Sequence, residues 1–350
     1  MDLNGTLSES QIDVLFAVYL SCLTPSVLGS FSVLVVSIVR WKHLKEQVLL
    51  LVQLALADLI AALILVFSTS LNKRDNADNV ILCQYSLPLS LTFYFISFLL
   101  VIVYAWKSKT AIHGWRAAPA EEPPAQSHCQ RTFVALPVYL LVWLLPIVMY
   151  VAYVHSDFMS ATPLLPANKV QEDRIIEKYC SSCIMFLHVG HDPCPGAEKR
   201  HDTFIRLFLV IVVIPVILSC SVIYYKVGKW YQTQERQCLF PVEGDGRSRK
   251  RFKSMFSIAR NMVMVILFCW TPALLLILLS FLVRGSYLGQ SHLFPVFVLQ
   301  AATVSLQGFL NSMVYAWRRP NFTSAVLGET TPLLPQHRLP FFDESLRVSF

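Results

Sequence analysis

The sequence predicts an all-α membrane protein folded as a bundle of seven transmembrane helices. Of its 350 residues, 55% are hydrophobic and 15% are charged, which is more apolar sequence than a soluble domain of this length can bury. The apolar residues gather in blocks of roughly 20 or more, the length that crosses a ~30 Å hydrocarbon core as an α-helix. Basic residues concentrate in every second connection between the blocks, as expected of a chain that crosses a membrane repeatedly.

Seven apolar blocks follow one another along the chain, and each predicts one spanning helix. The expected helices lie at about residues 12–39, 48–69, 80–106, 133–154, 204–227, 255–283 and 292–317. The first block follows a polar, acidic start, so we expect it to act as an uncleaved signal-anchor. The remaining segments are the N-terminus 1–11, a long loop 156–202, a basic loop 228–254 and a tail 318–350.

Loop charge predicts the direction of the chain. The loop after the first block carries Arg40, Lys42 and Lys45, and the loops after the third and fifth blocks are also basic, whereas the alternate loops are near neutral or acidic. Because Lys and Arg mark cytosolic loops, we expect the N-terminus outside the cytosol and the tail inside it. Asn4, in Asn4-Gly5-Thr6, is then a glycosylation acceptor. A multi-pass protein of the plasma membrane or an endolysosomal membrane is expected.

Asp58 is the one acidic residue in the middle of any predicted span. An unpaired carboxylate in lipid costs roughly 3 kcal/mol or more, so Asp58 should face the bundle interior and find polar partners there. A transporter or channel usually needs several such charges, which disfavours both classes. No histidine–carboxylate set with metal spacing occurs in the spans, so no enzyme is expected, and no basic stripe suits nucleic acid.

Three short motifs lie at matching depths in different helices. The second helix holds Leu54-Ala55-Leu56-Ala57-Asp58-Leu59, and the sixth holds Phe268-Cys269-Trp270-Thr271-Pro272. The seventh ends Asn311-Ser312-Met313-Val314-Tyr315 and is followed by Phe322. In this order and spacing they resemble the LAxAD, CWxP and NPxxY motifs of rhodopsin-like G-protein-coupled receptors. The resemblance covers most of the chain and implies the receptor fold, with a short amphipathic eighth helix.

The same resemblance assigns roles to the polar core. At the family's positions around a bound sodium ion the chain has Asp58, Ser97, Trp270, Gln307 and Asn311. A structural sodium ion is therefore the only cofactor that the resemblance implies, and no transition metal is expected. The alternative is a protonated Asp58 hydrogen-bonded to the same side chains, because Gln307 stands where the family usually has asparagine.

The resemblance also implies an activation switch, in which a kinked sixth helix swings its cytosolic end outward beneath a buried Trp270. Prolines kink helices because they remove a backbone hydrogen bond. The residues expected to carry the switch are Pro215, Trp270, Pro272, Asn311 and Tyr315. The alternative role for the two prolines is packing alone.

The chain departs from the receptor pattern at three places. The positions of the DRY motif read Lys107-Ser108-Lys109, so the arginine that contacts the G protein is missing. Gly29-Ser30 replaces the usual Gly-Asn pair, and Ser312 replaces the proline of NPxxY. The more particular segments resemble the transmembrane protein 116 family; they are 298–302, 307–311, 314–317 and Thr331-Pro332-Leu333-Leu334.

An outer ligand pocket is expected at Ser86, Ser90, Tyr94, Arg206, Trp270 and Gln300. Ser90 stands where amine receptors carry a carboxylate, and Ser305 where retinal pigments carry a lysine, so neither ligand is expected. Arg206 either pairs with an anionic headgroup or extends its charge to the membrane interface. The remaining ligand class is an extracellular or lipid-derived molecule.

Four cysteines fall on the predicted outer side, where disulfides form: Cys83, Cys180, Cys183 and Cys194. The resemblance implies that Cys83 is tied to the loop 156–202. Cys194 lies at a suitable distance, Cys180 and Cys183 compete with it, and the sequence does not choose between the pairings. The loop cysteines also have metal-ligand character beside His188 and His191, but an oxidising compartment favours disulfides. The cross-linked loop is expected to form a lid over the pocket.

Two functions follow from these features. The first is an orphan receptor in which a ligand shifts the bundle between two states, with G-protein coupling weakened by Lys107-Ser108-Lys109. The second is a receptor-fold scaffold or trafficking protein that does not signal. Glu329, with Leu333 and Leu334, fits an ExxxLL sorting signal in the tail. The expected partners are membrane lipid and either a heterotrimeric G protein or sorting adaptors.

Overall fold

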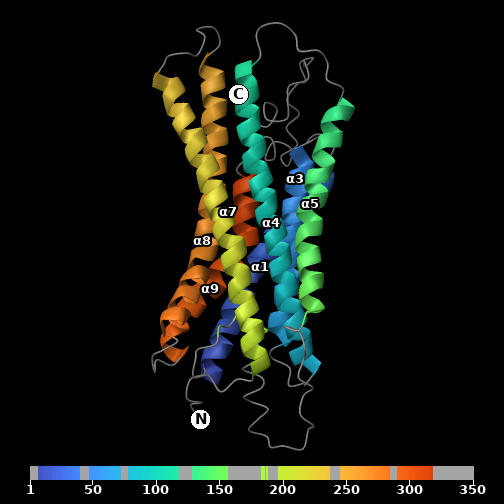
Figure 1. Ribbon diagram of the computed structural model, residues 1–350, viewed down its shortest axis with the longest axis vertical. Coiled ribbons are helices and arrows are strands. Elements are labelled where there is room, and N and C mark those ends of the chain that lie inside the picture. The colour runs from blue at the N-terminus through green and yellow to red at the C-terminus, as the bar shows by residue number, and fades with distance from the viewer. Residues whose placement is uncertain are drawn as a thin grey trace, which may run out of the picture.

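The computed structural model describes residues 7–39, 47–71, 78–117, 128–156, 183–185, 187, 196–236, 245–283 and 290–317. Within these residues the ordered elements are helices throughout (Figure 1). In chain order they are α1 (Glu9–Val39), α3 (Gln47–Leu71), α4 (Asp78–Ala117), α5 (His128–Val154), α7 (Gly196–Arg236), α8 (Asp245–Val283), η2 (Gln290–Leu293), α9 (Phe294–Ser305), α10 (Gln307–Ser312) and η3 (Met313–Trp317).

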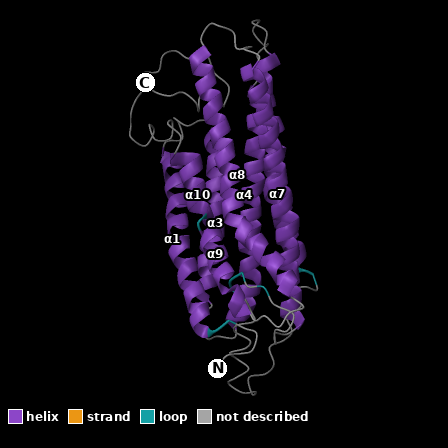
Figure 2. Cartoon of the chain, turned by 90° about the vertical axis from the view of Figure 1, so that its left-hand side faces the viewer, coloured by secondary structure: helices purple, strands orange, loops and turns teal. Residues whose placement is uncertain are grey.

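The described part of the chain contains 7 helical segments long and apolar enough to cross a membrane, the last of which joins α9 and α10 over Phe294–Ser312. Successive spans run in opposite directions along the long axis of the molecule, so that each connection lies at one end of the bundle (Figures 1 and 2). The predicted seven-helix membrane bundle is confirmed. The protein is an integral, multi-pass membrane protein.

Three helices are much longer than a membrane is thick. Helices α4, α7 and α8 contain 40, 41 and 39 residues, and at 1.5 Å per residue each is about 60 Å long, roughly twice the hydrocarbon thickness. At one end of the molecule they reach well beyond α1 and α10 (Figure 2). We call this end the extended end, and the opposite end, where α4 and α7 begin, the disulfide end.

These extensions change the loop boundaries expected from the sequence. Helix α4 continues to Ala117, α7 begins at Gly196 and ends at Arg236, and α8 begins at Asp245. The basic segment 228–254 is therefore largely helical, and the segment 156–202 gives its last residues to α7. Apolar blocks predict only the lipid-covered part of a helix, whereas lysine, arginine, glutamine and glutamate continue a helix readily in water.

Helix α4 lies at the centre of the bundle. Its span Leu82–Trp106 is 72% buried, against 22% for the span Pro137–Val154 of α5, which faces lipid over most of its surface.

Two prolines expected to act alike differ in position. Pro272 of α8 is buried, whereas Pro215 of α7 is exposed on the outer surface of the bundle.

The last span is broken between α9 and α10. Leu306 separates the two helices, and its backbone N–H donates to Ala302. The Ser26 hydroxyl of α1 lies at this break, where it donates to the Ser305 carbonyl and accepts from the Phe309 backbone N–H at 3.1 Å. In the NPxxY motif a proline interrupts the last helix, and this chain has Ser312 at that position. Here the interruption lies about two turns before Ser312, where Ser26 from a neighbouring helix binds the backbone groups near the break.

Candidate functional site

Asp58 lies in the middle of α3 with only 1% of its surface exposed. Both of its oxygens are hydrogen-bonded to amides of the last span. Asn311 donates from Nδ2 to Oδ2 at 2.7 Å, and Gln307 donates from Nε2 to Oδ1 at 3.3 Å. A carboxyl group buried this deeply needs such partners, because burying a polar group without them costs several kcal/mol.

Gln307 of α10 connects this carboxyl group to two further helices. Its Nε2 atom also lies 3.3 Å from the Ser97 hydroxyl of α4, and its Oε1 atom accepts from the Trp270 indole Nε1 of α8 at 2.6 Å. All five residues expected in the polar core therefore meet. The resulting network links α3, α4, α8 and α10 through buried side chains, with Gln307 at its centre.

The orientation of the Gln307 amide decides what this network can hold. The indole of Trp270 can only donate, so the Gln307 oxygen must face it, and the amide N–H₂ must face Asp58 and Ser97. The N–H₂ group thus lies between the carboxylate and the hydroxyl that would be ligands of a cation. The residues present do not fit a sodium ion in this arrangement, although the Asn311 Oδ1 atom is buried and has no hydrogen-bond partner among the described residues.

We expect the stability of the protein to be independent of sodium. A bound ion stabilises the folded state by mass action, so a sodium site would raise the melting temperature in NaCl above that in choline chloride at equal ionic strength. With Gln307 occupying the site, melting in detergent should differ by less than ~1 °C between the two salts. Gln307→Ala serves as the comparison. A sodium-dependent rise in the unsubstituted protein would contradict this geometry.

Trp270 is packed among aromatic rings. Tyr94 and Phe98 of α4 meet it edge-to-face, with ring centroids 5.5 and 5.1 Å away, and its own surface is 1% exposed. Its neighbour Cys269 accepts a hydrogen bond on its carbonyl from the Thr303 hydroxyl of α9 at 3.1 Å. This carbonyl belongs to the turn that Pro272 loosens. Trp270 is therefore held on one side by rings and on the other by Gln307.

Most of the expected ligand-pocket residues have partners within the protein. Ser86 donates to the Cys83 carbonyl at 3.4 Å, and Ser90 donates to the Ala61 carbonyl at 3.0 Å. Gln300 exchanges hydrogen bonds of 3.3 and 3.2 Å with the Tyr19 hydroxyl of α1. Tyr19 was not among the expected site residues, and a tyrosine inside an apolar block was the only signal for it.

Arg206 is neutralised by its own helix. Its Nη2 atom lies 2.6 Å from Asp202 Oδ2, both side chains are about nine-tenths buried, and the guanidinium lies over the Phe281 ring at 5.6 Å. The pair was not expected from the sequence because Asp202 falls in the predicted loop 156–202, although its i, i+4 spacing from Arg206 was visible. Arg206 is therefore paired within the protein rather than with an anionic headgroup.

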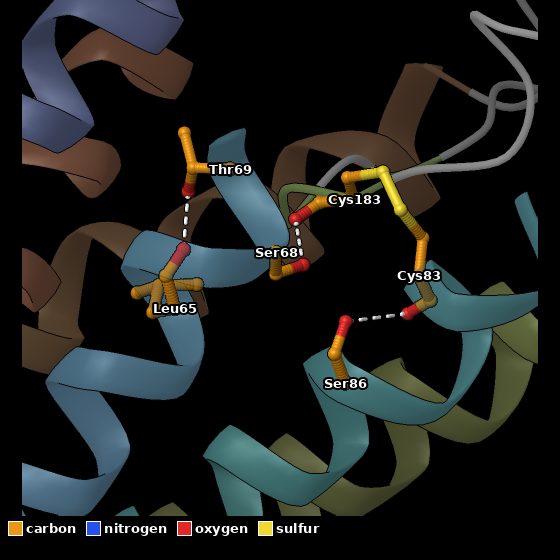
Figure 3. The surroundings of a disulfide bond; sticks show 6 residues. All are labelled: Leu65, Ser68, Thr69, Cys83, Ser86 and Cys183. Atoms are coloured by element: carbon orange, nitrogen blue, oxygen red, sulfur yellow. Dashed lines mark hydrogen bonds between the residues drawn. A yellow bond between two sulfur atoms is a disulfide. The ribbon is translucent and has the colours of Figure 1, made fainter. Parts of the chain in front are cut away.

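A disulfide joins α4 to Cys183 of the long loop (Figure 3). Cys83 pairs with Cys183, with Cα atoms 4.6 Å apart, so the partner is neither Cys194 nor Cys180, which lie outside the described residues. Ser68 of α3 donates to the Cys183 carbonyl at 2.6 Å. The pairing depends on how the loop enters the bundle, which cysteine spacing does not encode.

Cys183, Ile184, Met185 and Leu187 are 4%, 5%, 4% and 1% exposed and belong to the hydrophobic core of the bundle. The backbone of Met185 also donates a hydrogen bond to the Tyr19 hydroxyl. The described part of the loop is therefore packed inside the helices.

Residues 13–334 match the model of the family described as Transmembrane protein 116. The chain belongs to the transmembrane protein 116 family. The matched region includes the second to seventh spans, nearly all of the first, and the polar core around Asp58, so the membership concerns the whole bundle.

In this family member, two positions that depart from the receptor pattern meet in space. A Cβ atom on Gly29 of α1 would lie 3.3 Å from the Ser312 hydroxyl, and one on Gly308 would lie 2.9 Å from the Ser30 hydroxyl. Glycine at both positions lets α1 and α10 approach closely, as small residues do at helix contacts in membranes. The serines that replace the usual asparagine and proline thus lie at one interface.

Several expected features lie outside the described residues, namely Asn4, Cys180, Cys194, Glu329, Leu333, Leu334 and the eighth helix. Tyr315 lies in the π-helical segment η3, and Lys107, Ser108 and Lys109 lie within α4. Among the described residues no group of three His, Cys, Asp or Glu side chains could hold a metal ion.

Proposed function

We propose that this protein is a receptor-fold conformational switch, in which events at the disulfide end change the packing of α8 and alter the extended end. The observation that carries this proposal is the 2.6 Å hydrogen bond from Trp270 to Gln307. Through Gln307 it couples a ring-packed residue of α8 to the buried carboxyl group of α3. The resemblance of Asp58, Trp270 and Asn311 to rhodopsin-like receptor positions supports the same function.

The switch acts through the shared amide of Gln307. Any displacement of Trp270 removes the indole donor that orients this amide, and the bonds that the amide donates to Asp58 and Ser97 then weaken together. Because Pro272 loosens the same part of α8, a small tilt there becomes a large displacement at the far end of a helix about 60 Å long. Such packed networks change between discrete arrangements rather than continuously.

The extended end is the side proposed to contact a partner, and we propose that it faces the cytosol because its sequence is rich in Lys and Arg. Lys107, Ser108 and Lys109 of α4 lie there in place of the G-protein-contacting arginine. We therefore propose a partner other than an efficiently coupled heterotrimeric G protein. A panel of G-protein sensors should show little basal signal from protein forced to the cell surface. A strong signal would overturn this part of the proposal.

The switch is tested by measuring distances at the extended end. Trp106 of α4 is 67% exposed, and Arg260 of α8 is also exposed, so both sites accept spin labels through click-reactive amino acids that leave the native cysteines untouched. We expect Gln307→Leu to shift the 106–260 distance distribution in nanodiscs. Thr24→Val, which removes an exposed hydroxyl bonded within α1, is the matched control and should leave the distribution unchanged. Identical distributions in all three proteins would refute switching.

A second candidate function is trafficking without signalling, favoured by the loss of the DRY arginine and by Glu329, Leu333 and Leu334 in the tail. If the tail binds a sorting adaptor, replacing Leu333 and Leu334 with alanine should move the protein from internal membranes to the cell surface by several-fold, measured by surface biotinylation. Replacing Leu339 with alanine, also in the tail, is the control. An unchanged surface fraction would remove the support for this function.

A further inference from the structure

Residues 183–185 and 187, which we call the segment, lie in the interior of the bundle at its disulfide end. We infer that this end contains a binding site for an apolar peptide, and that the chain's own segment is its resident ligand. The inference rests on the proposed switching function, because it names what occupies the site that controls Trp270. An external ligand would have to displace this segment before it could bind.

Burial of the segment is the first observation. Ile184, Met185 and Leu187 retain 5%, 4% and 1% of their surface and pack into the same core as the spanning helices. A connection between helices normally runs over the surface, because its backbone polar groups need water. A stretch with three buried apolar side chains instead fills space that the helices leave between them.

The backbone of the segment is held at defined points, as a bound peptide is. The disulfide attaches Cys183 to α4, and Ser68 of α3 donates to the Cys183 carbonyl at 2.6 Å (Figure 3). The Tyr19 hydroxyl of α1 accepts from the backbone of Met185. Side chains on two helices thus satisfy polar groups of a short buried peptide, and a third helix holds it covalently; hydrogen bonds to the main chain are a general feature of peptide sites.

A chain of contacts leads from the segment to the switch. Tyr19 exchanges hydrogen bonds with Gln300, and the Gln300 carbonyl accepts from the Thr303 hydroxyl at 3.3 Å. Thr303 also donates to the carbonyl of Cys269, the residue before Trp270. Movement of Met185 therefore changes the partners of Tyr19 and, through α9, the backbone turn that positions Trp270.

The chemistry of the site matches an uncharged, apolar ligand. Arg206 is already paired with Asp202, and the hydroxyls of Ser86 and Ser90 are bonded to backbone carbonyls. The polar side chains that bond to the segment are the hydroxyls of Ser68 and Tyr19, and its own buried side chains Ile184, Met185 and Leu187 are apolar. A charged ligand would lose hydration at this site without gaining a counter-ion.

The inference is tested by emptying the site and refilling it. The full-length protein with Ile184→Ala, Met185→Ala and Leu187→Ala loses buried apolar volume, and its melting temperature in detergent should fall by roughly 10 °C. A synthetic peptide with the sequence of residues 182–188, with serine at the cysteine position, should restore at least half of that loss. The same peptide should leave the unsubstituted protein unchanged, because its site is occupied.

Two controls keep the test specific. Replacing Leu141, Leu144 and Val148 with alanine removes similar volume from the exposed face of α5, and this variant should neither lose stability nor respond to peptide. A scrambled peptide should have no effect on the emptied site. Equal responses to both peptides, or no response to the native one, would overturn the inference. Should the triple variant not fold, Met185→Ala alone should show a smaller fall and the same peptide selectivity.

The two proposals fail in different ways. If the peptide restores stability while the 106–260 distance distribution never changes, the resident ligand stands and the switching function falls. If Gln307→Leu changes that distribution while the peptide leaves the emptied protein unstable, switching stands and the resident ligand falls.

Discussion

Replacing Gln307 with leucine should lower the free energy of unfolding by about 4 kcal/mol. The substitution leaves the indole N–H of Trp270 without its acceptor in the bundle interior, takes one donor away from Asp58, and removes the contact with Ser97. Each unsatisfied buried group costs about 1–3 kcal/mol, and leucine supplies no acceptor or donor in compensation. Unfolding in mixed micelles of increasing SDS content measures the change.

Gln300→Leu is the matched control for this prediction, because Gln300 is an equally buried glutamine on the same span whose side chain bonds Tyr19. Its loss should cost roughly half as much. A double-mutant cycle of Trp270→Phe and Gln307→Leu should then show a coupling of about 1–2 kcal/mol, because both changes remove the same bond. Equal costs for Gln300→Leu and Gln307→Leu, or additive effects in the cycle, would show that Gln307 is not the centre of the network.

Gly308→Val should destabilise the bundle by about 3 kcal/mol. A Cβ atom at this position would lie 2.9 Å from the Ser30 hydroxyl and 3.3 Å from Ser26 Cβ, so α1 and α10 must separate. Separation also weakens the bonds by which Ser26 holds the break near Ser305 and Phe309. The same SDS titration measures the loss.

Smaller substitutions at the interface between α1 and α10 show which contact causes the loss of stability. Gly308→Ala should lower the free energy of unfolding by less than Gly308→Val does. Adding Ser30→Ala should restore the stability of Gly308→Ala, because the Ser30 hydroxyl is the atom nearest the new Cβ and has no hydrogen-bond partner among the described residues. Gly29→Ala meets its nearest atom at 3.3 Å and should be milder than Gly308→Ala. If Ser30→Ala gives no rescue, the close contact between α1 and α10 is not what limits this position.

The membrane topology could be predicted from sequence because it depends on local properties. Length and hydrophobicity of each block decide whether it crosses a bilayer, and neither requires knowledge of the neighbours. Helix lengths could not be predicted as well. The polar extensions of α4 and α8 are helical without being apolar. A prediction based on hydropathy therefore ends both helices at the membrane boundary.

The polar core was predictable in its membership but not in its geometry. Asp58 must have partners wherever it lies, and the resemblance to receptor motifs named Ser97, Gln307 and Asn311 correctly as neighbours. The sequence left a sodium ion and a protonated Asp58 as alternatives. Only the position of Trp270 orients the Gln307 amide with its N–H₂ toward the carboxyl group, where a cation would otherwise lie.

The sequence by itself determined the seven spans and the burial of Asp58, because an apolar run of roughly 20 residues crosses a membrane as a helix and a lone carboxyl group must be kept away from lipid. The residues around Asp58 were expected from the resemblance to receptor motifs. The tertiary structure decided that Cys83 pairs with Cys183 and that Met185 lies beside Tyr19. These outcomes depend on which surfaces meet when the helices pack. Many arrangements satisfy the same local preferences, and only the packed bundle selects one of them.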